Sequence, residues 1–103
     1  MKIYDYQPVY DILFNRVPTP TYLKIRKDGD YYLATSAARG EIISLNKLAG
    51  EICLACNGKN KLEDIYNELL RNYPDTDKLQ IAYDLCRCIA DLESFGMVSV
   101  VRR

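Results

Sequence analysis

Residues 41–58, EIISLNKLAGEICLACNG, indicate the fold of this chain more clearly than any other segment. The first five residues are mostly apolar or β-branched, over a length typical of a strand. Asn46 can cap a helix, because its side-chain oxygen accepts from free backbone N–H groups of the first turn. Asn57-Gly58 can end that helix. We therefore expect a strand over 41–45 and a helix to about residue 56, with an apolar face of Leu48, Ala49, Ile52, Cys53 and Cys56.

Two further strands precede this one. Leu23 and Ile25 alternate with polar neighbours, a period of two that predicts a half-buried strand. Asp28-Gly29 predicts a hairpin turn, because Gly accepts positive φ. The run YYLAT, residues 31–35, predicts the next strand, and Gly40 marks the turn into 41–45. Residues 21–45 thus predict a three-stranded antiparallel meander.

A second helix follows the first. It is predicted to begin at Asn60, with Glu63 three positions on, close to a capping box. Pro74 ends it. Its apolar residues fall at i, i+3, i+4, i+7, i+8 and i+11, which is one stripe of a helix: Leu62, Ile65, Tyr66, Leu69, Leu70 and Tyr73.

A third helix and a short strand complete the pattern. The helix is predicted to start near Asp77, with Gln80 in the box position, and to run to about Phe95. Gly96 suits the position just beyond its end. Residues 97–101, MVSVV, predict a final strand. The expected fold class is α+β, with a three-stranded antiparallel sheet packed on three helices.

The third helix carries two apolar faces, because successive residues turn by about 100°. One face must serve the core: Ile81, Leu85, Cys88, Leu92 and Phe95. The other lies almost opposite: Leu79, Tyr83, Cys86 and Ala90. A polar ridge separates them: Gln80, Asp84, Arg87, Asp91 and Ser94.

Two interpretations of the second face stay open. The N-terminal segment or the sheet covers it within the same chain, as small domains often bury a central helix on most sides. Alternatively, it is one wall of a groove whose other wall is the strand at 41–45. An edge strand with free N–H and C=O groups can accept an added peptide strand.

Residues 1–20 form an N-terminal arm of uncertain structure, and the domain proper spans 21–103. The arm contains Tyr4, Tyr6 and the stiff Pro18-Thr19-Pro20. Residues 8–16 suit a short helix with Pro near its start. An irregular strap is the alternative.

Composition excludes several classes of function. The chain has 103 residues, suited to one domain, and 14 basic residues balance 14 acidic ones. No net positive field would attract nucleic acid or an anionic membrane. There is no His, so nucleophiles activated by His are excluded. The start lacks signal-peptide character and no apolar run could span a bilayer, so we expect a cytoplasmic protein.

The four cysteines suggest a metal site as one alternative. Cys53 and Cys56 form a C-x-x-C, and Cys86 and Cys88 a C-x-C. Four thiolates would suit zinc or an iron–sulfur cluster. However, the first pair lies within a predicted helix and the second pair points about 200° apart. We therefore expect buried thiols, no metal and no cofactor.

DNA binding is a second alternative, which the predicted outline of helices and strands would allow. A recognition helix normally lies in a basic environment. The segment from 78 to 95 has only two basic residues, Lys78 and Arg87, against three acidic ones, Asp84, Asp91 and Glu93. We therefore expect no nucleic-acid partner.

The order and spacing of motifs resemble those of the PqqD-like family. The family pattern is a strand ending in Leu-Asn, an Ala/Gly-Glu-Ile-Leu helix and a Cys-Asp-Gly-like stop. The matching residues here are Leu45-Asn46, Gly50-Glu51-Ile52 and Cys56-Asn57-Gly58. The resemblance continues through the second and third helices and covers about residues 22–100. Residues 1–20 lie outside it.

The resemblance implies a winged helix-turn-helix-like fold and a non-catalytic role as a RiPP recognition element. Such a domain holds the leader of a ribosomally synthesised precursor peptide, which adds as a strand beside the third strand and against the third helix. Carried onto this chain, the groove comprises Glu41, Ile42, Ile43, Ser44, Leu45, Leu79, Tyr83, Cys86, Arg87 and Ala90.

The resemblance also implies roles and partners. Leu79, Tyr83 and Ala90 would contact apolar leader residues, and Arg87 would pair with a leader carboxylate unless it is a solvated ridge charge. The partner enzyme is a radical-SAM enzyme, a protease or a cyclase, and nothing in the sequence selects among them. An uncovered strand edge would also allow a homodimer.

Overall fold

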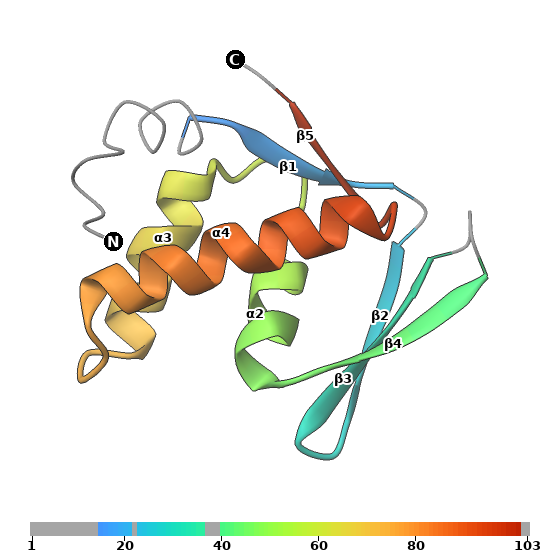
Figure 1. Cartoon of the computed structure of the whole chain (residues 1–103), viewed down its shortest axis with the longest axis horizontal. Coiled ribbons are helices and arrows are strands. Elements are labelled where there is room, and N and C mark those ends of the chain that lie inside the picture. Colours follow the sequence, from blue (N-terminus) through green and yellow to red (C-terminus); the bar gives the residue numbers. More distant parts are fainter. Residues whose placement is uncertain (1–14, 22, 37–39, 102–103) are drawn as a thin grey trace.

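The three strands predicted in residues 21–45 form one antiparallel sheet (Figure 1). They are β2 (Leu23–Asp28), β3 (Tyr31–Ser36) and β4 (Glu41–Leu45), in the order β2-β3-β4. This computed structural model describes residues 15–21, 23–36 and 40–101. Gly29 has φ 63°, as the hairpin turn requires. The predicted meander is confirmed.

The register gives the sheet two different faces. Ala34 pairs with Ile25 on β2 and with Ile43 on β4. Ala34 is fully buried, and both partners pack against the core. The neighbouring row joins Lys24, Thr35 and Ile42, with Lys24 and Ile42 exposed. One face therefore packs on the helices and the other faces outward.

The described chain has three helices. They are α2 (Lys47–Ala55), α3 (Leu62–Asn72) and α4 (Lys78–Ser94), and α4 crosses the others at the centre of the molecule (Figure 1). Helix α2 packs directly on the inner face of the sheet, while α4 packs against both α2 and α3. The N–H of Ala49 donates to the Asn46 side chain over 2.9 Å, which confirms that cap. The expected α+β class, with a three-stranded antiparallel sheet and three helices, is confirmed.

The start of α3 differs from the prediction by one residue. Lys61, not Asn60, precedes the first turn, and the Asp64 carboxylate accepts from the Lys61 N–H at 2.9 Å. The Asn60 side chain instead donates to the carbonyl of Ala55, closing the turn after α2. Glu63 therefore lies one position too early for the reciprocal cap.

The cap of α4 is only partly as predicted. The Asp77 side chain accepts from the Leu79 N–H at 3.3 Å, as a cap should. Gln80 does not complete the box, because its side chain donates to Asp84 one turn on. Gly96 follows the helix with φ 72°, as expected for a helix end.

A two-stranded ribbon joins the two ends of the described chain. It pairs β1 (Val17–Pro20) with β5 (Val98–Val101). Val17 and Val98 are buried. The sequence predicts the final strand, but it indicates an arm and not a strand for residues 17–20. The helix suggested over residues 8–16 lies mostly outside the described residues.

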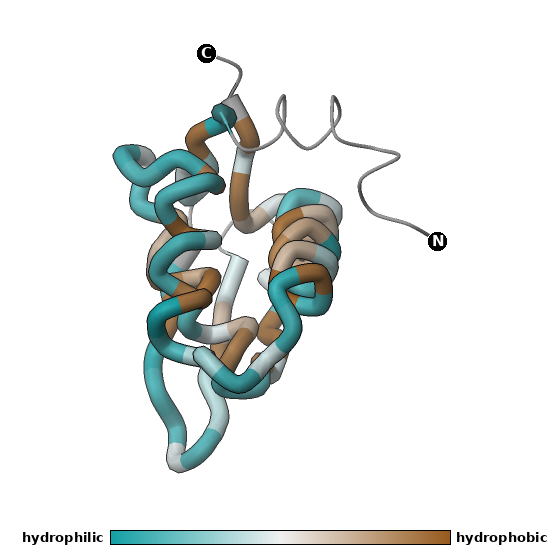
Figure 2. The backbone as a smooth tube through the Cα atoms, turned by 90° about the vertical axis from the view of Figure 1, so that its left-hand side faces the viewer, coloured by the Kyte–Doolittle hydropathy of each residue, from teal (hydrophilic) through white to brown (hydrophobic). Residues whose placement is uncertain are grey.

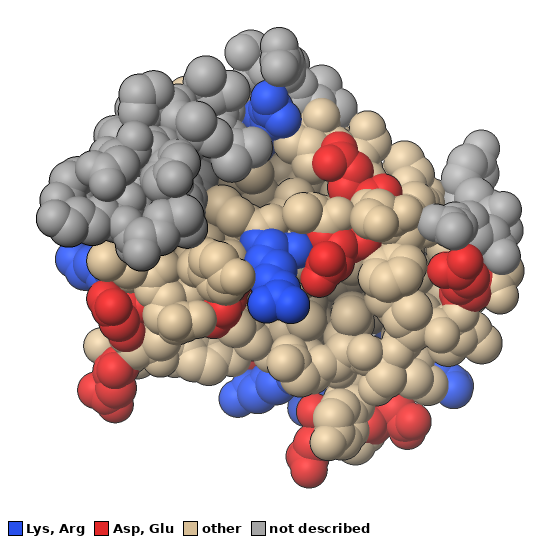
Figure 3. Space-filling model, in the orientation of Figure 1, with Lys and Arg blue, Asp and Glu red and all other residues tan. Residues whose placement is uncertain are grey.

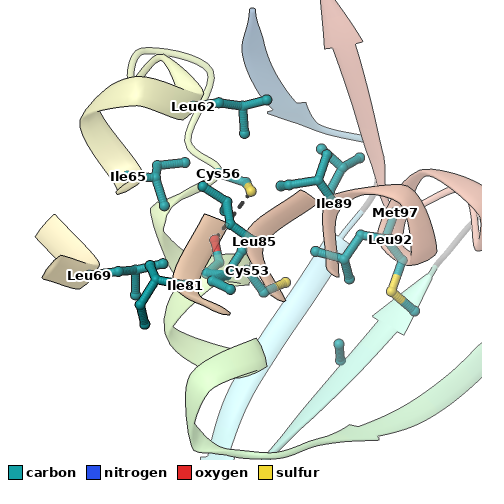
Figure 4. Close-up of a cluster of buried hydrophobic side chains, with 13 residues drawn as sticks. Cys53, Cys56, Leu62, Ile65, Leu69, Ile81, Leu85, Ile89, Leu92 and Met97 are labelled. Carbon is teal, nitrogen blue, oxygen red and sulfur yellow. Dashed lines mark hydrogen bonds between the residues drawn. The ribbon is translucent and has the colours of Figure 1, made fainter. Parts of the chain in front are cut away.

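The core lies where α4 meets α2, α3 and the sheet. Figure 2 shows hydrophobic residues between the helices and a hydrophilic tip on the β2–β3 hairpin. The Cys56 thiol donates to the carbonyl of Ile52 within this core (Figure 4). No helix in the described residues is both long and apolar enough to cross a membrane. The largest buried side chains include Ile52, Leu62, Ile65, Ile81, Leu85, Leu92 and Met97.

Candidate functional site

A cleft of about 530 Å³ separates β4 from α4. The start of α2 closes its end. The cleft therefore lies between the predicted third strand and the predicted third helix. Its lining residues come from three elements: Ile43, Ser44, Leu45, Asn46, Leu48, Ala49, Ile52, Asp84, Arg87, Cys88, Asp91, Leu92 and Phe95.

The cleft has an apolar floor. Ile52 and Leu92 are almost completely buried and belong to the core. Ile43, Leu45 and Phe95 are partly buried above them and pack against the same core. Apolar surface left partly open beside a core is suited to receiving another apolar side chain.

The α4 rim of the cleft is charged. Asp84, Arg87 and Asp91 are spaced by three and four residues, so they share one flank of the helix. Figure 3 shows acidic and basic side chains next to one another over α4. Among the described residues, neither Arg87 nor Asp91 forms an ion pair, and Asp84 accepts a hydrogen bond from Gln80 at 2.8 Å. These charges can therefore meet a ligand of mixed charge.

The β4 wall provides a strand edge. β3 pairs with β4 on one side, and no strand of the described chain pairs with β4 on the other. In an antiparallel sheet, the backbone N–H and C=O groups of alternate residues point away from the paired neighbour. The open edge can therefore hydrogen-bond to an extended peptide.

The structure brings together part of the predicted groove. Four of its residues line the cleft, namely Ile43, Ser44, Leu45 and Arg87. Glu41 and Ile42 lie on the same strand without lining the cleft. The Ile42 side chain is exposed on the outer face of the sheet.

The other four predicted residues lie on the far flank of α4. These are Leu79, Tyr83, Cys86 and Ala90, and none lines the cleft. The helix buries a face centred on Leu85 against the core. At about 100° per residue, the polar ridge and the second apolar face flank this buried face on opposite sides. The structure turns the polar ridge toward β4.

Sequence reasoning missed several lining residues. Asp84 and Asp91 carried a signal, because they belong to the ridge between the two apolar faces. Cys88 was assigned to the core face, and it is partly buried at the edge of that face. Helix α2 also contributes lining residues to the cleft, namely Leu48, Ala49 and Ile52. Their position there depends on how the helices pack, which the sequence pattern of α2 does not indicate.

Burial keeps the thiols of this chain protonated. It raises the pKa of Cys53 to about 11 and, with Cys53, Asp91 and Asp84 nearby, that of Cys88 to about 12. Burial also raises the pKa of Cys56 and of Cys86. Protonated thiols are poor nucleophiles and poor metal ligands. In the described ranges, no group of three or more Cys, Asp or Glu residues could hold a metal ion.

A tyrosine hydroxyl also links two of the helices. The Tyr73 hydroxyl donates to the Glu51 carboxylate at 2.8 Å. Burial, this hydrogen bond and the negative charge of Glu51 raise the pKa of Tyr73 to about 12. The phenol therefore stays neutral and ties α3 to α2.

Comparison with known proteins agrees with the geometry. The family model described as coenzyme PQQ synthesis protein D (PqqD) matches residues 31–98. This range includes the whole of β4, α2, α3 and α4, and therefore every residue that lines the cleft. No curated protein matches the chain.

A solved structure shares the fold. It is TbiB1 in complex with the TbiA(beta) leader peptide, with a TM-score of 0.70 and 13% sequence identity. The match covers 79% of this chain and 94% of that chain. At this identity the likeness concerns the fold, while the family match covers well over half of the sequence. This chain belongs to the PqqD family.

Proposed function

We infer that this chain is a peptide-binding protein that holds the leader of a ribosomally synthesised precursor peptide for a modifying enzyme. The observation that carries this inference is the apolar cleft beside the open edge of β4. Family membership supports it, as does the shared fold with TbiB1, whose solved structure contains a leader peptide.

The proposed binding mode is strand addition. The leader extends along β4 from Glu41 to Leu45, and backbone hydrogen bonds supply affinity independent of sequence. Every second side chain of the leader then points to the same side. One apolar side chain enters the cleft over Ile52 and Leu92, where its burial contributes about 1.5–3 kcal/mol.

The charged rim adds specificity to this mode. Arg87 can form a bidentate pair with a leader carboxylate. Asp84 and Asp91 flank Arg87 along the helix and favour a basic leader residue on either side of that carboxylate. The rim is open to solvent, so these charges discriminate among peptides more than they add raw affinity.

The role we assign is presentation without catalysis by this chain. Binding the leader raises the effective concentration of the core peptide at the enzyme that modifies it. The enzyme is a radical-SAM enzyme, a protease or a cyclase, and supplies any cofactor. The protonated thiols of the described chain are poor nucleophiles, which supports a role in which the enzyme performs the chemistry.

Two alanine substitutions on α4 test which flank contacts the leader. Arg87→Ala removes a cleft charge, and we expect roughly tenfold weaker leader binding, as for loss of a charge-assisted hydrogen bond. Tyr83→Ala tests the flank favoured by the sequence. Both side chains are exposed, so neither substitution should unfold the protein.

Calorimetric titration with the leader of the precursor encoded beside this chain supplies the measurement. Arg71→Ala, an exposed arginine on α3 outside the cleft, is the matched control and should bind like wild type. Weaker binding by Arg87→Ala supports the cleft. If Tyr83→Ala alone weakens binding, the leader lies on the other flank of α4.

A further inference from the structure

The outer face of the β2-β3-β4 sheet carries a surface that the leader-binding role does not use. The register aligns Lys24, Thr35 and Ile42 in one row across the sheet, and Arg26 with Leu33 in the next. A shallow depression of about 360 Å³ lies among these side chains. We call these five residues the outer patch.

The part of the outer patch on β3 and β4 is largely apolar. Ile42 is 67% exposed, and Leu33 is only partly buried on the same face. Tyr31, which shares the face by register, is 58% exposed. The solvated face of an antiparallel sheet is usually polar, so several exposed apolar residues on one such face point to a covering surface.

The edge of the outer patch is basic. Lys24 and Arg26 are both exposed on β2, beside the apolar residues of β3 and β4. Protein–protein interfaces combine an apolar part with polar residues at its margin. Because the charged margin of this patch is positive, the complementary surface is apolar with carboxylates on one side.

The charge argues against a second copy of this chain as the occupant. In a two-fold symmetric pair, the same patch meets itself. Lys24 and Arg26 of both copies would then share one interface, and like charges there are unfavourable. The apolar residues of the patch, in turn, argue against nucleic acid, whose backbone binding rests on basic side chains.

We propose that the outer patch docks the acidic, apolar surface of the enzyme that modifies the bound peptide. The identity of this partner rests on the proposed function. Ile42 belongs to the outer patch, whereas its neighbour Ile43 lines the cleft, so β4 lies between the two sites. The leader and the enzyme can therefore bind at the same time, and the tethered core peptide is held close to the enzyme.

The test measures binding of the enzyme encoded beside this chain, by surface plasmon resonance without leader. The double substitution Lys24→Glu and Arg26→Glu should weaken enzyme binding by tenfold or more, and Ile42→Ser by about threefold to tenfold. The matched control reverses two exposed charges outside the outer patch, Lys59→Glu and Lys61→Glu, and should bind like wild type.

Leader titration of the same variants separates this proposal from the proposed function. The double substitution on β2 should leave leader affinity within about twofold, because neither residue lines the cleft. Equal enzyme binding by all variants, or none by wild type, would overturn the docking proposal while leaving leader binding intact. Duplex DNA binding lost with the basic residues but not with Ile42→Ser would assign the patch to nucleic acid. A dimer dispersed by Ile42→Ser in sedimentation would assign it to self-association.

Discussion

Cys88 lines the cleft, but its environment makes its thiol unreactive. Its side chain is partly buried and lines the cleft, where a reactive thiol would meet any bound peptide. Burial, the main cause, raises its pKa to about 12, and negative charge from Cys53, Asp91 and Asp84 acts in the same direction. At neutral pH the thiol is therefore almost entirely protonated.

This predicts slow alkylation of Cys88. An ordinary thiol, with a pKa of about 8.5, is substantially ionised by pH 8–9. Because the pKa of Cys88 is raised, its reaction with iodoacetamide should accelerate only above about pH 10. Mass spectrometry of digested protein across a pH series measures this at each cysteine, with the urea-unfolded chain as the control. Reaction at pH 8 as fast as in the unfolded chain would contradict the stated environment.

The sequence pattern of α4 predicts only part of the site. The pattern of α4 located two apolar faces and a polar ridge, which are properties of the helix alone. Which flank approaches β4 depends on how the sheet packs, and side-chain periodicity carries no information on that. The sequence therefore places Asp84 and Asp91 on the polar ridge without indicating that they line the cleft.

The elements themselves followed closely from local signals. Asp28-Gly29 forms the hairpin turn, Asn46 caps α2, and Asp77 caps α4. Each signal acts within a few residues, so the sequence contains it in full. The sequence predicts the start of α3 one residue too early for an equally local reason. The Asn60 side chain donates a hydrogen bond to the Ala55 carbonyl and does not cap the helix.

Strand addition predicts a period of two along the leader. N-methylation removes one backbone donor without altering the side chain. In a strand paired on one edge, only alternate N–H groups face the partner. Single N-methyl groups scanned along the leader should therefore weaken binding at every second position, by roughly three- to tenfold. Isothermal titration of the series tests this, and equal effects at consecutive positions would exclude strand pairing with β4.

The contact of α2 with the sheet depends on Gly50. A Cβ added at this position would overlap the Tyr32 ring on β3. Gly50→Ala should therefore destabilise the fold by about 1–3 kcal/mol through overpacking. The same change favours an exposed helix by about 1 kcal/mol.

Removing the Tyr32 ring by substitution with alanine completes a double-mutant cycle. In the Tyr32→Ala background, Gly50→Ala should be neutral or stabilising, because nothing then opposes the gain in helix propensity. Urea unfolding of the four proteins gives the coupling free energy. Similar losses from Gly50→Ala in both backgrounds would show that the ring does not limit this contact.

At the scale of the whole molecule, the sequence did not reveal the ribbon of β1 and β5. Pro18 and Pro20 made residues 17–20 read as part of an arm, yet proline is tolerated in a strand that has an unpaired edge. The contact is also distant in sequence, since the Thr21 hydroxyl donates to the carbonyl of Gly96, 75 residues away. Local patterns cannot identify such partners.

The arrangement of the whole molecule gives each face of β4 a separate proposed task. The cleft side receives the leader, and the outer patch receives the enzyme. Between them, Ala34 at the centre of the sheet is completely buried. In this proposal, a small domain connects two partners.

The first experiment is a calorimetric titration of the purified chain with the leader of the precursor peptide encoded beside it. We expect saturable one-to-one binding that is lost when the leader sequence is scrambled, since side chains must fit the cleft. Folded protein that binds neither the leader nor the full precursor up to high micromolar concentration would contradict the proposed role of this chain in leader recognition.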